Sequence, residues 1–575
     1  MAALSPWWRS SVINRRAWGW ENDHQGNQQN RWWSNAVIYQ INPWSYQDTN
    51  GDGIGDLQGI ISRLDYVAAL GVDAIWLSPI YKSPMKDMGY DICDMRAIDS
   101  QFGTLADFDQ LVELAHSLDL KVIVDQVLNH TSDQHPWFVE SQQSRDNRKA
   151  DWYVWADAQA DGSPPNNWRS AITGESAWAW SESRQQFYLH NFLADQPDLN
   201  WNNPETVDAI LDNVRFWLER GVDGLRLDAV NFYIHDPELR DNPPRSEDMP
   251  LPDGVPAGHP LAEQVLKYSF CHDCNIEAIA RIRRLVNEYP DVMTLGEIAI
   301  SEDSVKLAGD YVKADEGLHL AYHTGLLADK PLTAPLLHQL INHVQENFAT
   351  GSTCWIVGNH DYGRLKSRWC CQGGQPYPDA FYHMVAALLL TLPGAFCLYQ
   401  GDELGLTTAD IPEDISPEQL RDPMGQTFYP DIKGRDPSRT PMPWQAEALN
   451  AGFTTAKAPW LPIPQAHYSM SVDREAVDST SLLNTWRRLL YWRQKQPALQ
   501  AGNFCWRESD EKIVAFVREY AEQSLLCLFN LSDRPATYKL PADTTCEGVY
   551  LGFEFDRQGD TVYLPAFSVY FGELL

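Results

Sequence analysis

The segment Gly224-Leu-Arg-Leu-Asp-Ala-Val230 decides the fold class of this chain. Its apolar residues are typical of a short buried strand, and an aspartate follows at the carboxyl end. The segment Val292-Met-Thr-Leu-Gly-Glu-Ile298 has the same form and ends with Glu297. A single acid in this place is as readily an ordinary loop residue after a core strand. Two of them predict parallel strands whose carboxyl ends bring acidic groups to one site.

Six further apolar runs of strand length lie on either side of these two segments. Amphipathic helical patterns, such as those over 105–118 and 206–219, separate the runs. Eight strands that alternate with helices predict an α/β fold, the (β/α)8 TIM barrel. In chain order, the expected strands are Ala36–Asn42, Ala74–Pro79, Lys121–Leu128, Gly224–Val230, Met293–Ile298, Leu318–Tyr322, Cys354–Val357 and Ala395–Tyr399.

The spacing of the runs predicts two additions to the barrel. The interval after the third strand is too long for one helix and its loops, and its wealth of Trp, Asn, Ser and Pro indicates an inserted lobe. Near the C-terminus, short alternating runs over 513–520, 524–530, 548–555 and 561–571 predict a small antiparallel β domain, a β-sandwich. The expected organisation is an N-terminal extension (1–30), a first part of the barrel (31–130), the lobe (131–203), a second part of the barrel (204–496) and the C-terminal domain (497–575).

The composition excludes several classes of partner. The 575 residues carry a net charge of −33 from 45 basic and 78 acidic residues, and this field repels nucleic acid and anionic membranes. The longest apolar run, 384–399, is interrupted by Pro393-Gly394 and is too short to span a bilayer. The first residues lack the apolar region of a signal peptide. We therefore expect a cytoplasmic monomer or homodimer with no nucleic-acid or membrane partner.

A pair of carboxylates at one strand edge is what glycosidic bond cleavage needs. Five short segments, in order along the chain, together resemble the motifs of the α-amylase family, glycoside hydrolase family 13. The second of them resembles the oligo-1,6-glucosidase and α-glucosidase branch of that family. The segments are Asp125-Gln-Val-Leu-Asn-His130, Gln196-Pro-Asp-Leu-Asn200, Gly224-Leu-Arg-Leu-Asp228, Gly296-Glu297 and Asn359-His-Asp361.

The resemblance implies a role for each matched side chain. Asp228 would be the nucleophile, Glu297 the general acid/base, and Asp361 a third carboxylate that stabilises the transition state. Arg226, two residues before Asp228 on the same strand, points to the same face and favours the ionised nucleophile. The histidines that match those holding sugar hydroxyls are His130 and His360. A structural histidine is the alternative for each of them.

Two more segments that match the branch imply a closed glucose subsite. They are Lys86-Asp-Met-Gly-Tyr-Asp91 and Gly434-Arg-Asp-Pro-Ser-Arg-Thr-Pro-Met-Pro-Trp444. The resemblance has Tyr90 of the first segment stack on the sugar ring. It has Asp87 and Arg439 grip the far hydroxyls and form an ion pair, which prevents a longer chain from passing. The implied activity is removal of single α-glucose units from the non-reducing end of a small oligosaccharide or α-glucoside. An ordinary surface salt bridge is the alternative.

The loop Asp48-Thr-Asn-Gly-Asp-Gly-Ile-Gly-Asp56 places oxygen ligands at every second position. The side chains of Asp48, Asn50, Asp52 and Asp56, with the carbonyl of Ile54, resemble the first nine positions of an EF-hand loop. Position twelve holds a glycine where a bidentate glutamate belongs, so a single structural Ca²⁺ or Mg²⁺ is expected. An Asx-rich turn without metal is the alternative. No organic cofactor is expected.

The sequence departs from the branch on the acceptor side. Ile172 stands where an aromatic is usual, while Phe192 can still supply an apolar wall. Ala229 follows the nucleophile, and the resemblance associates alanine there with α-1,4 links and valine with α-1,6 links. Three interpretations remain: an exo-acting retaining α-glucosidase, a transglucosylase or sucrose-active relative, and a barrel that has lost catalysis and serves as a binding subunit. The intact acids argue against the last one.

Overall fold

A computed structural model describes residues 31–256, 258–313, 316–328, 330–349, 352–372, 375–410, 420–541 and 545–575. The expected extension 1–30 lies outside them. Eight parallel strands close into a barrel in the order β1-β15-β12-β11-β10-β9-β5-β2. The fold class predicted from the sequence is confirmed. The barrel strands are β1 (Val37–Ile41), β2 (Ala74–Leu77), β5 (Lys121–Gln126), β9 (Gly224–Leu227), β10 (Met293–Glu297), β11 (Leu320–Tyr322), β12 (Thr353–Ile356) and β15 (Ala395–Tyr399).

Inward-facing side chains fill the lower part of the barrel. Residues two apart on each strand share a face, and Trp76, Leu295 and Tyr322 belong to one buried cluster inside the barrel. Gly224 makes room in this layer, because a Cβ there would lie 3.0 Å from Ile123 Cγ1. The next inward positions on β5, β9 and β10 carry polar groups instead of apolar ones, so the functional layer lies directly above the core.

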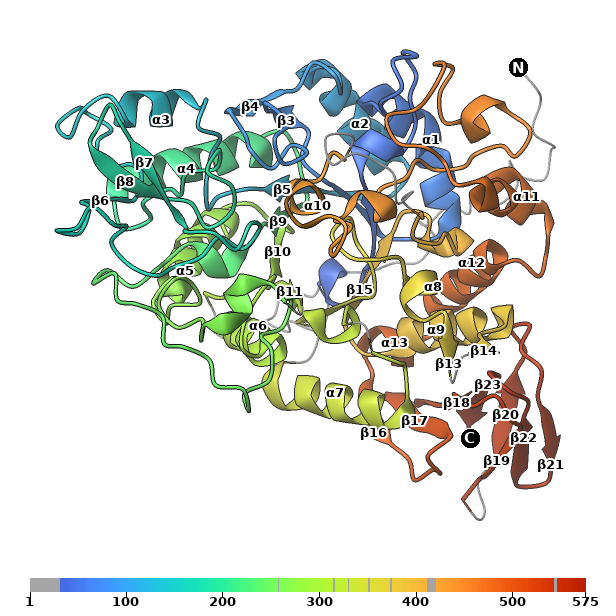
Figure 1. Ribbon diagram of the computed structural model, residues 1–575. Coiled ribbons are helices and arrows are strands. Elements are labelled where there is room, and N and C mark those ends of the chain that lie inside the picture. Colours follow the sequence, from blue (N-terminus) through green and yellow to red (C-terminus); the bar gives the residue numbers. More distant parts are fainter. Residues whose placement is uncertain are drawn as a thin grey trace.

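Helices surround the strands and cover their outward faces (Figure 1). The first helix begins and ends at ordinary signals: Asp56 caps it by accepting the Gly59 N–H, and Gly71 ends it in the left-handed region. The helices are α1 (Leu57–Leu70), α2 (Leu105–Ser117), α3 (Pro136–Ser141), α4 (Pro204–Leu218), α5 (Asn275–Val286), α6 (Ser304–Lys313), α7 (Ala334–Asn347), α8 (Leu365–Arg368), α9 (Asp379–Thr391), α10 (Pro423–Phe428), α11 (Val472–Val477), α12 (Leu482–Arg493) and α13 (Pro497–Ala501).

The segment between β5 and α4 forms a lobe of its own. Its three-stranded sheet has the order β6-β8-β7, and Trp168, Trp178 and Phe187 pack in its small core. In Figure 1 this lobe and the C-terminal domain lie at opposite ends of the molecule. The short strands outside the barrel are β3 (Tyr81–Lys82), β4 (Asp94–Ile98), β6 (Trp155–Ala156), β7 (Trp178–Ser181), β8 (Gln186–Leu189), β13 (Cys371–Gln372) and β14 (Gln375–Pro376).

The C-terminal domain consists of two antiparallel sheets, in the orders β16-β17-β18-β23-β20 and β19-β22-β21. Alternate residues of β17 face opposite ways: Val517 packs between the sheets, while Phe516 packs against the barrel unit. The expected run 561–571 is two strands, because Pro565 interrupts it. The expected run 548–555 is mostly loop after β20. The strands are β16 (Asn503–Trp506), β17 (Ile513–Tyr520), β18 (Gln523–Asn530), β19 (Ala536–Lys539), β20 (Cys546–Val549), β21 (Asp556–Gln558), β22 (Thr561–Leu564) and β23 (Val569–Leu574).

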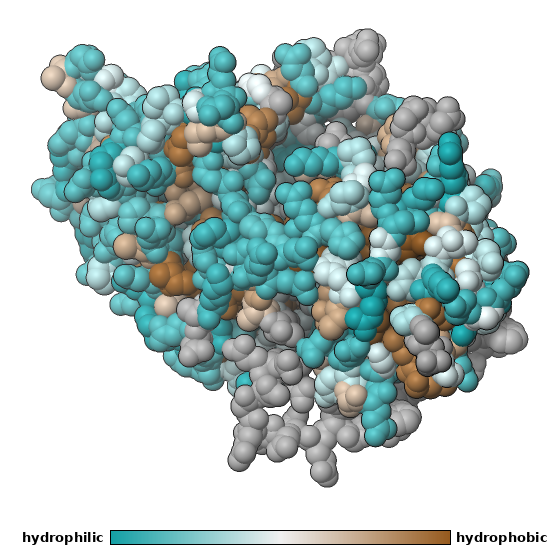
Figure 2. Space-filling model, turned by 90° about the horizontal axis from the view of Figure 1, so that it is seen from below, coloured by the Kyte–Doolittle hydropathy of each residue, from teal (hydrophilic) through white to brown (hydrophobic). Residues whose placement is uncertain are grey.

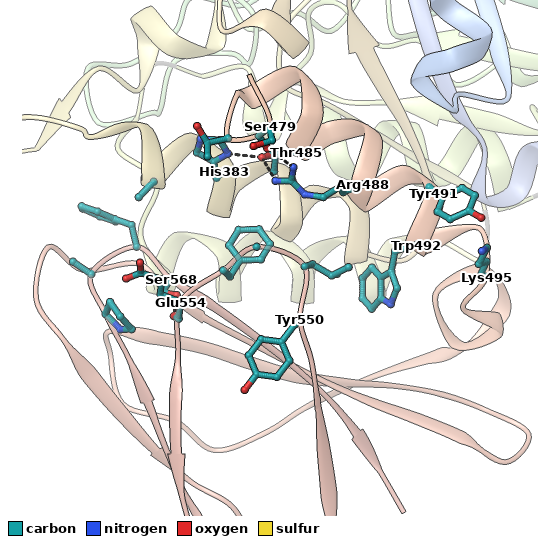
Figure 3. A pocket seen from close by; sticks show the side chains of 18 residues that line it. His383, Ser479, Thr485, Arg488, Tyr491, Trp492, Lys495, Tyr550, Glu554 and Ser568 are labelled. Atoms are coloured by element: carbon teal, nitrogen blue, oxygen red, sulfur yellow. Dashed lines mark hydrogen bonds between the residues drawn. The ribbon is translucent and has the colours of Figure 1, made fainter. Parts of the chain in front are cut away.

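Hydrophilic side chains cover most of the face shown in Figure 2, and the hydrophobic residues there form separate small patches. Among the described residues, no helix is both long and apolar enough to cross a membrane. A groove of about 810 Å³ separates α12 from the C-terminal domain, and aromatic side chains including Trp492 and Tyr550 line it (Figure 3). It lies at the junction between the barrel unit and the C-terminal domain.

Candidate active site

Three adjacent strands bring four charged side chains to the inner face of the barrel. Asp125 on β5 pairs in register with Arg226 on β9, and Asp228 follows two residues later on the same face. Arg226 is also in register with Leu295 on β10, so Glu297, two residues on, lies one layer higher. Parallel strands without breaks explain why residues far apart in the sequence meet here.

Arg226 is fully buried and holds all three carboxylates at once. Its Nη1 lies 2.7 Å from Asp125 Oδ1 and 2.7 Å from Asp228 Oδ1, and its Nη2 lies 2.5 Å from Glu297 Oε2. The Tyr322 hydroxyl accepts a further bond of 2.8 Å from Nη2. One positive charge therefore faces three acids, so the cluster gains by retaining a proton.

Two acids of this cluster, Asp228 and Asp125, have raised pKa values. Burial raises the pKa of Asp228 well above its ordinary value, Arg226 opposes that rise, and the neighbouring acids reinforce it. Burial likewise raises the pKa of Asp125 to about 6, against the effect of Arg226. The sequence indicated that Arg226 favours the ionised Asp228. Arg226 does lower the pKa of Asp228, but burial has the larger effect.

Asp361 lies in the loop after β12, and its carboxylate accepts from two arginines and one histidine. Arg435 Nη1 and Arg439 Nη2 both lie 3.1 Å from its Oδ1, and His360 Nε2 lies 3.2 Å from its Oδ2. Burial acts to raise the pKa of Asp361, but His360 and the two arginines outweigh it and hold the pKa well below the usual range. Asp361 is therefore an anion near pH 7.

The aromatic and histidine residues form a second layer above the acids. The Tyr90 ring stacks on the His360 ring with centroids 5.3 Å apart, and its hydroxyl lies 2.6 Å from His360 Nε2 and 3.1 Å from Asp125 Oδ2. Burial lowers the pKa of His360 to about 3 and that of His130 to about 4. Both imidazoles are neutral near pH 7 and can exchange hydrogen bonds with uncharged hydroxyl groups.

The expected ion pair between Asp87 and Arg439 is wrong. Arg435 pairs with Asp87 instead, at 2.7 Å, and also with Asp361 and with the buried Asp422 at 2.5 Å. Arg439 donates to the His360 carbonyl at 2.7 Å and to Asp361. Both arginines lie in one irregular segment. The path of its backbone, and not the spacing of residues in the sequence, therefore determines which arginine reaches Asp87.

Phe192 and Ile172, the two residues that the sequence analysis predicts on the acceptor side, differ in exposure. Phe192 is partly exposed, with its ring 5.0 Å from that of His130 and 5.1 Å from that of Phe232. Ile172 is buried, and its carbonyl lies 3.5 Å from His259 Nε2. Phe192 therefore lies beside His130, the candidate sugar ligand.

The loop 48–56 uses its carboxylates to fold. Asp48 accepts from the Gly51 and Gly53 N–H groups, while Asp56 accepts from Thr49 and caps α1. Asn50 and Asp52 accept from the N–H groups two residues on, and the fifth expected ligand is the Ile54 carbonyl. In the described part of the chain, no three acidic, histidine or cysteine side chains are arranged to hold a metal ion. Oxygen donors suit Ca²⁺ or Mg²⁺. However, Asp48 Oδ2 already accepts from Gly53 and Thr454, and Asp56 Oδ1 from Thr49 and Gly59, so the expected ligand group is not assembled.

Four residues of the site were not singled out from the sequence. Asp125 opens the segment that ends at His130, and Gln196 donates to Asp87 at 3.2 Å. Arg435 lies four residues before Arg439, and Asp422 caps α10. The first three lie in segments that match the family motifs, which is the signal that could have identified them. Asp422 lies outside those segments, and nothing local marks it.

The comparisons with known proteins agree with this geometry. Residues 40–502 match the model of the alpha amylase catalytic domain, and residues 505–571 match that of the maltogenic amylase C-terminal domain. A probable alpha-glucosidase of Rhizobium meliloti (strain 1021) is 45% identical over 94% of this chain and 97% of its own. An oligo-1,6-glucosidase of Heyndrickxia coagulans is 36% identical over 93% of this chain and 98% of its own.

Among solved structures, the alpha-glucosyl transfer enzyme XgtA has 47% sequence identity and a TM-score of 0.90. The match covers 95% of this chain and 100% of that one. Matches of this extent include the barrel, the inserted lobe and the C-terminal domain together. The chain belongs to the α-amylase family, glycoside hydrolase family 13.

Proposed function

We propose that this protein is an exo-acting, retaining α-glucosidase that releases α-glucose from the non-reducing end of short α-glucosides. The observation that carries the proposal is the shared guanidinium of Arg226, which binds Asp228 and Glu297 through its two terminal nitrogens. Two acids bound to one guanidinium suit a retaining mechanism, in which the carboxyl groups are about 5–5.5 Å apart, better than an inverting one, in which they are about 6.5–9.5 Å apart.

The three acids divide the reaction between them. Asp228 attacks the anomeric carbon and forms a covalent glucosyl ester, while Glu297 protonates the departing oxygen and later takes a proton from the attacking water. Asp361 stays ionised and faces the positive charge that develops on the sugar. Neutral His130 and His360 hold sugar hydroxyls, and Tyr90 stacks on the ring.

The exo-acting part of the proposal rests on the far end of the glucose subsite. Asp87, Arg435 and Asp361 form a linked network, and the side chains of Asp87 and Arg435 are 6% and 12% exposed. Exposed surface pairs contribute little, but this one is buried beside the candidate acids. A network in this position blocks a longer chain, so only a terminal glucose can enter.

The linkage preference rests on Ala229. Its small side chain leaves room on the leaving-group side, which favours α-1,4 links, although a methyl-sized difference is worth only about 1–3 kcal/mol of discrimination. A panel of maltose, isomaltose, nigerose, sucrose and trehalose, with the products followed by NMR, tests this directly. Fast release of glucose from maltose supports the proposal, and sole activity on isomaltose or sucrose refutes it.

A second candidate function is α-glucosyl transfer to a sugar or alcohol acceptor. The likeness to the alpha-glucosyl transfer enzyme XgtA, at 47% sequence identity, favours it. Transfer uses the same acids and differs only in whether water or another hydroxyl takes the glucosyl group. Products longer than the substrate at high maltose concentration identify transfer, whereas glucose alone identifies hydrolysis.

We also propose that the loop 48–56 binds one Ca²⁺ or Mg²⁺. The support is the alternate spacing of oxygen donors, which are the ligands that these hard cations prefer. An ion that binds only the folded form raises the melting temperature. Elemental analysis of the purified protein, with melting curves before and after chelation, tests the proposal.

A further inference from the structure

Ala229 has an unusual backbone conformation directly after Asp228. Its φ and ψ are 41° and 47°, in the left-handed region that residues other than glycine rarely adopt. The residue is 2% exposed and precedes the 3-10 turn Val230–Phe232. Strained residues of this kind persist where the surrounding structure determines them and often lie at functional sites.

This conformation aims the main-chain N–H of Ala229 at Glu297. The N–H donates to Glu297 Oε2 at 3.0 Å, and Arg226 Nη2 lies 2.5 Å from the same oxygen. Oε2 therefore accepts from two donors. Within the described residues, no donor binds Oε1, and the Glu297 side chain is 8% exposed.

The two oxygens of Glu297 are consequently unequal. A proton on Oε2 would point toward two groups that are themselves donors, and one of those bonds would be lost. A proton on Oε1 leaves both bonds intact. The neutral acid is therefore stabilised in one form, with its O–H on the oxygen that is free to meet a ligand.

We infer that the Ala229 N–H is a positioning group that, together with Arg226, holds Oε2 of Glu297 so that Oε1 carries the proton given to the leaving oxygen. The inference rests on the proposed α-glucosidase function. In the glycosylation step, the Oε1–H bond breaks and an O–H bond forms on the leaving oxygen. That oxygen keeps the electron pair of the broken glycosidic bond, while Asp228 forms the ester.

Replacement of the Ala229 amide by an ester removes this one donor and keeps the methyl side chain. Lactic acid, introduced at position 229 by nonsense suppression, makes the change. Maltose has a poor leaving group that needs the proton, whereas 2,4-dinitrophenyl α-glucoside has a good one that does not. The expected result is a fall in kcat/KM of about 10- to 100-fold for maltose and less than about threefold for the dinitrophenyl glucoside, because a hydrogen bond to a charged group is worth about 1.5–3 kcal/mol.

One control separates positioning from loss of structure. Phenyllactic acid at position 232 removes the Phe232 N–H that donates to the Ala229 carbonyl at 2.9 Å in the same turn, without touching Glu297. This replacement should lower the stability of the protein and leave the ratio of kcat/KM for the two substrates unchanged.

The results distinguish the inference from the function on which it rests. If the Ala229 ester lowers kcat/KM equally for both substrates, or for neither of them, the inference is overturned. If Glu297→Gln turns over maltose normally, the proposed function itself is refuted. Neutron diffraction of the unaltered protein at a pH at which Glu297 is protonated needs no variant: a deuteron on Oε1 supports the inference, and one on Oε2 overturns it.

Discussion

The substitution Arg435→Gln tests the closed end of the glucose subsite. Arg435 binds Asp87 at 2.7 Å, Asp361 at 3.1 Å and Asp422 at 2.5 Å, and the Asp87 and Asp422 side chains are 6% and 0% exposed. Glutamine is similar in size and polar, but it leaves these carboxylates without their shared cation.

The stability loss follows from that uncompensated charge. Removal of one partner of a buried ion pair costs about 3–5 kcal/mol. With an unfolding entropy of about 2.1 cal/mol/K per residue, this corresponds to a fall in melting temperature of about 2–4 °C for a chain of this length. The control Arg474→Gln breaks an exposed pair with Glu447 and should change the melting temperature by less than about 1 °C.

The loss should depend on pH in a defined direction. Burial acts to raise the pKa values of Asp361 and Asp422, but Arg435 and its neighbours hold both below the usual value. A depressed carboxyl pKa contributes stability that is present above the unfolded value, near 3.8, and is lost as pH falls through the folded value. The difference between wild type and Arg435→Gln should therefore be largest near pH 7 and shrink below pH 4.

Activity should change in both rate and chain-length preference. The displaced Asp87 and Asp361 no longer hold the terminal glucose, so kcat/KM for maltose should fall by about 100-fold, which corresponds to about 3 kcal/mol. The ratio of kcat/KM for maltoheptaose to that for maltose should rise, since the end of the subsite is open. Assays of released glucose measure both quantities, and Arg435→Lys should recover part of the maltose activity. If Arg435→Gln keeps the maltose value within threefold and the same length preference, the closed-subsite argument fails.

Three further outcomes are expected. The variant Glu297→Gln should lose maltose hydrolysis by several orders of magnitude while its melting curve stays near that of wild type, because an amide cannot donate the proton; normal turnover in a glucose-release assay contradicts this. Chelation should lower the melting temperature more than the activity at low temperature if the loop 48–56 binds an ion, and an unchanged melting curve with no metal by elemental analysis refutes that site. Gly224→Ala should lower stability by about 1–3 kcal/mol in chemical unfolding, since its Cβ would lie 3.0 Å from Ile123 in the full barrel core; a neutral effect would mean that the barrel interior is loosely filled.

The barrel was predictable because each of its strands is a short apolar run between helical patterns. Periodicity two also placed Arg226 and Asp228 on one inner face, and the structure brings Glu297 to the same guanidinium. These relations depend on regular backbone geometry, which the sequence pattern determines. In the C-terminal domain, Pro565 was a visible signal that the last run is two strands.

The parts that could not be predicted depend on irregular backbone. Arg435 and Arg439 lie four residues apart around a short 3-10 turn, and only its path decides which of them reaches Asp87. In the loop 48–56, the spacing indicated metal ligands. It did not indicate that backbone N–H groups compete for the same oxygens, as at Asp56, which caps α1. Burial, which raises the pKa of Asp228 against Arg226, is a property of the assembled barrel and not of the segment 224–230.

The anomeric form of the first glucose released from 4-nitrophenyl α-glucoside, whose leaving group contributes no glucose of its own, tests the central claim most directly. Proton NMR follows the α and β signals during the first minutes, before mutarotation mixes them. A retaining mechanism, in which Asp228 and Glu297 act from opposite sides of one bond, releases α-glucose first. Early accumulation of β-glucose would contradict the assignment of Asp228 as the nucleophile.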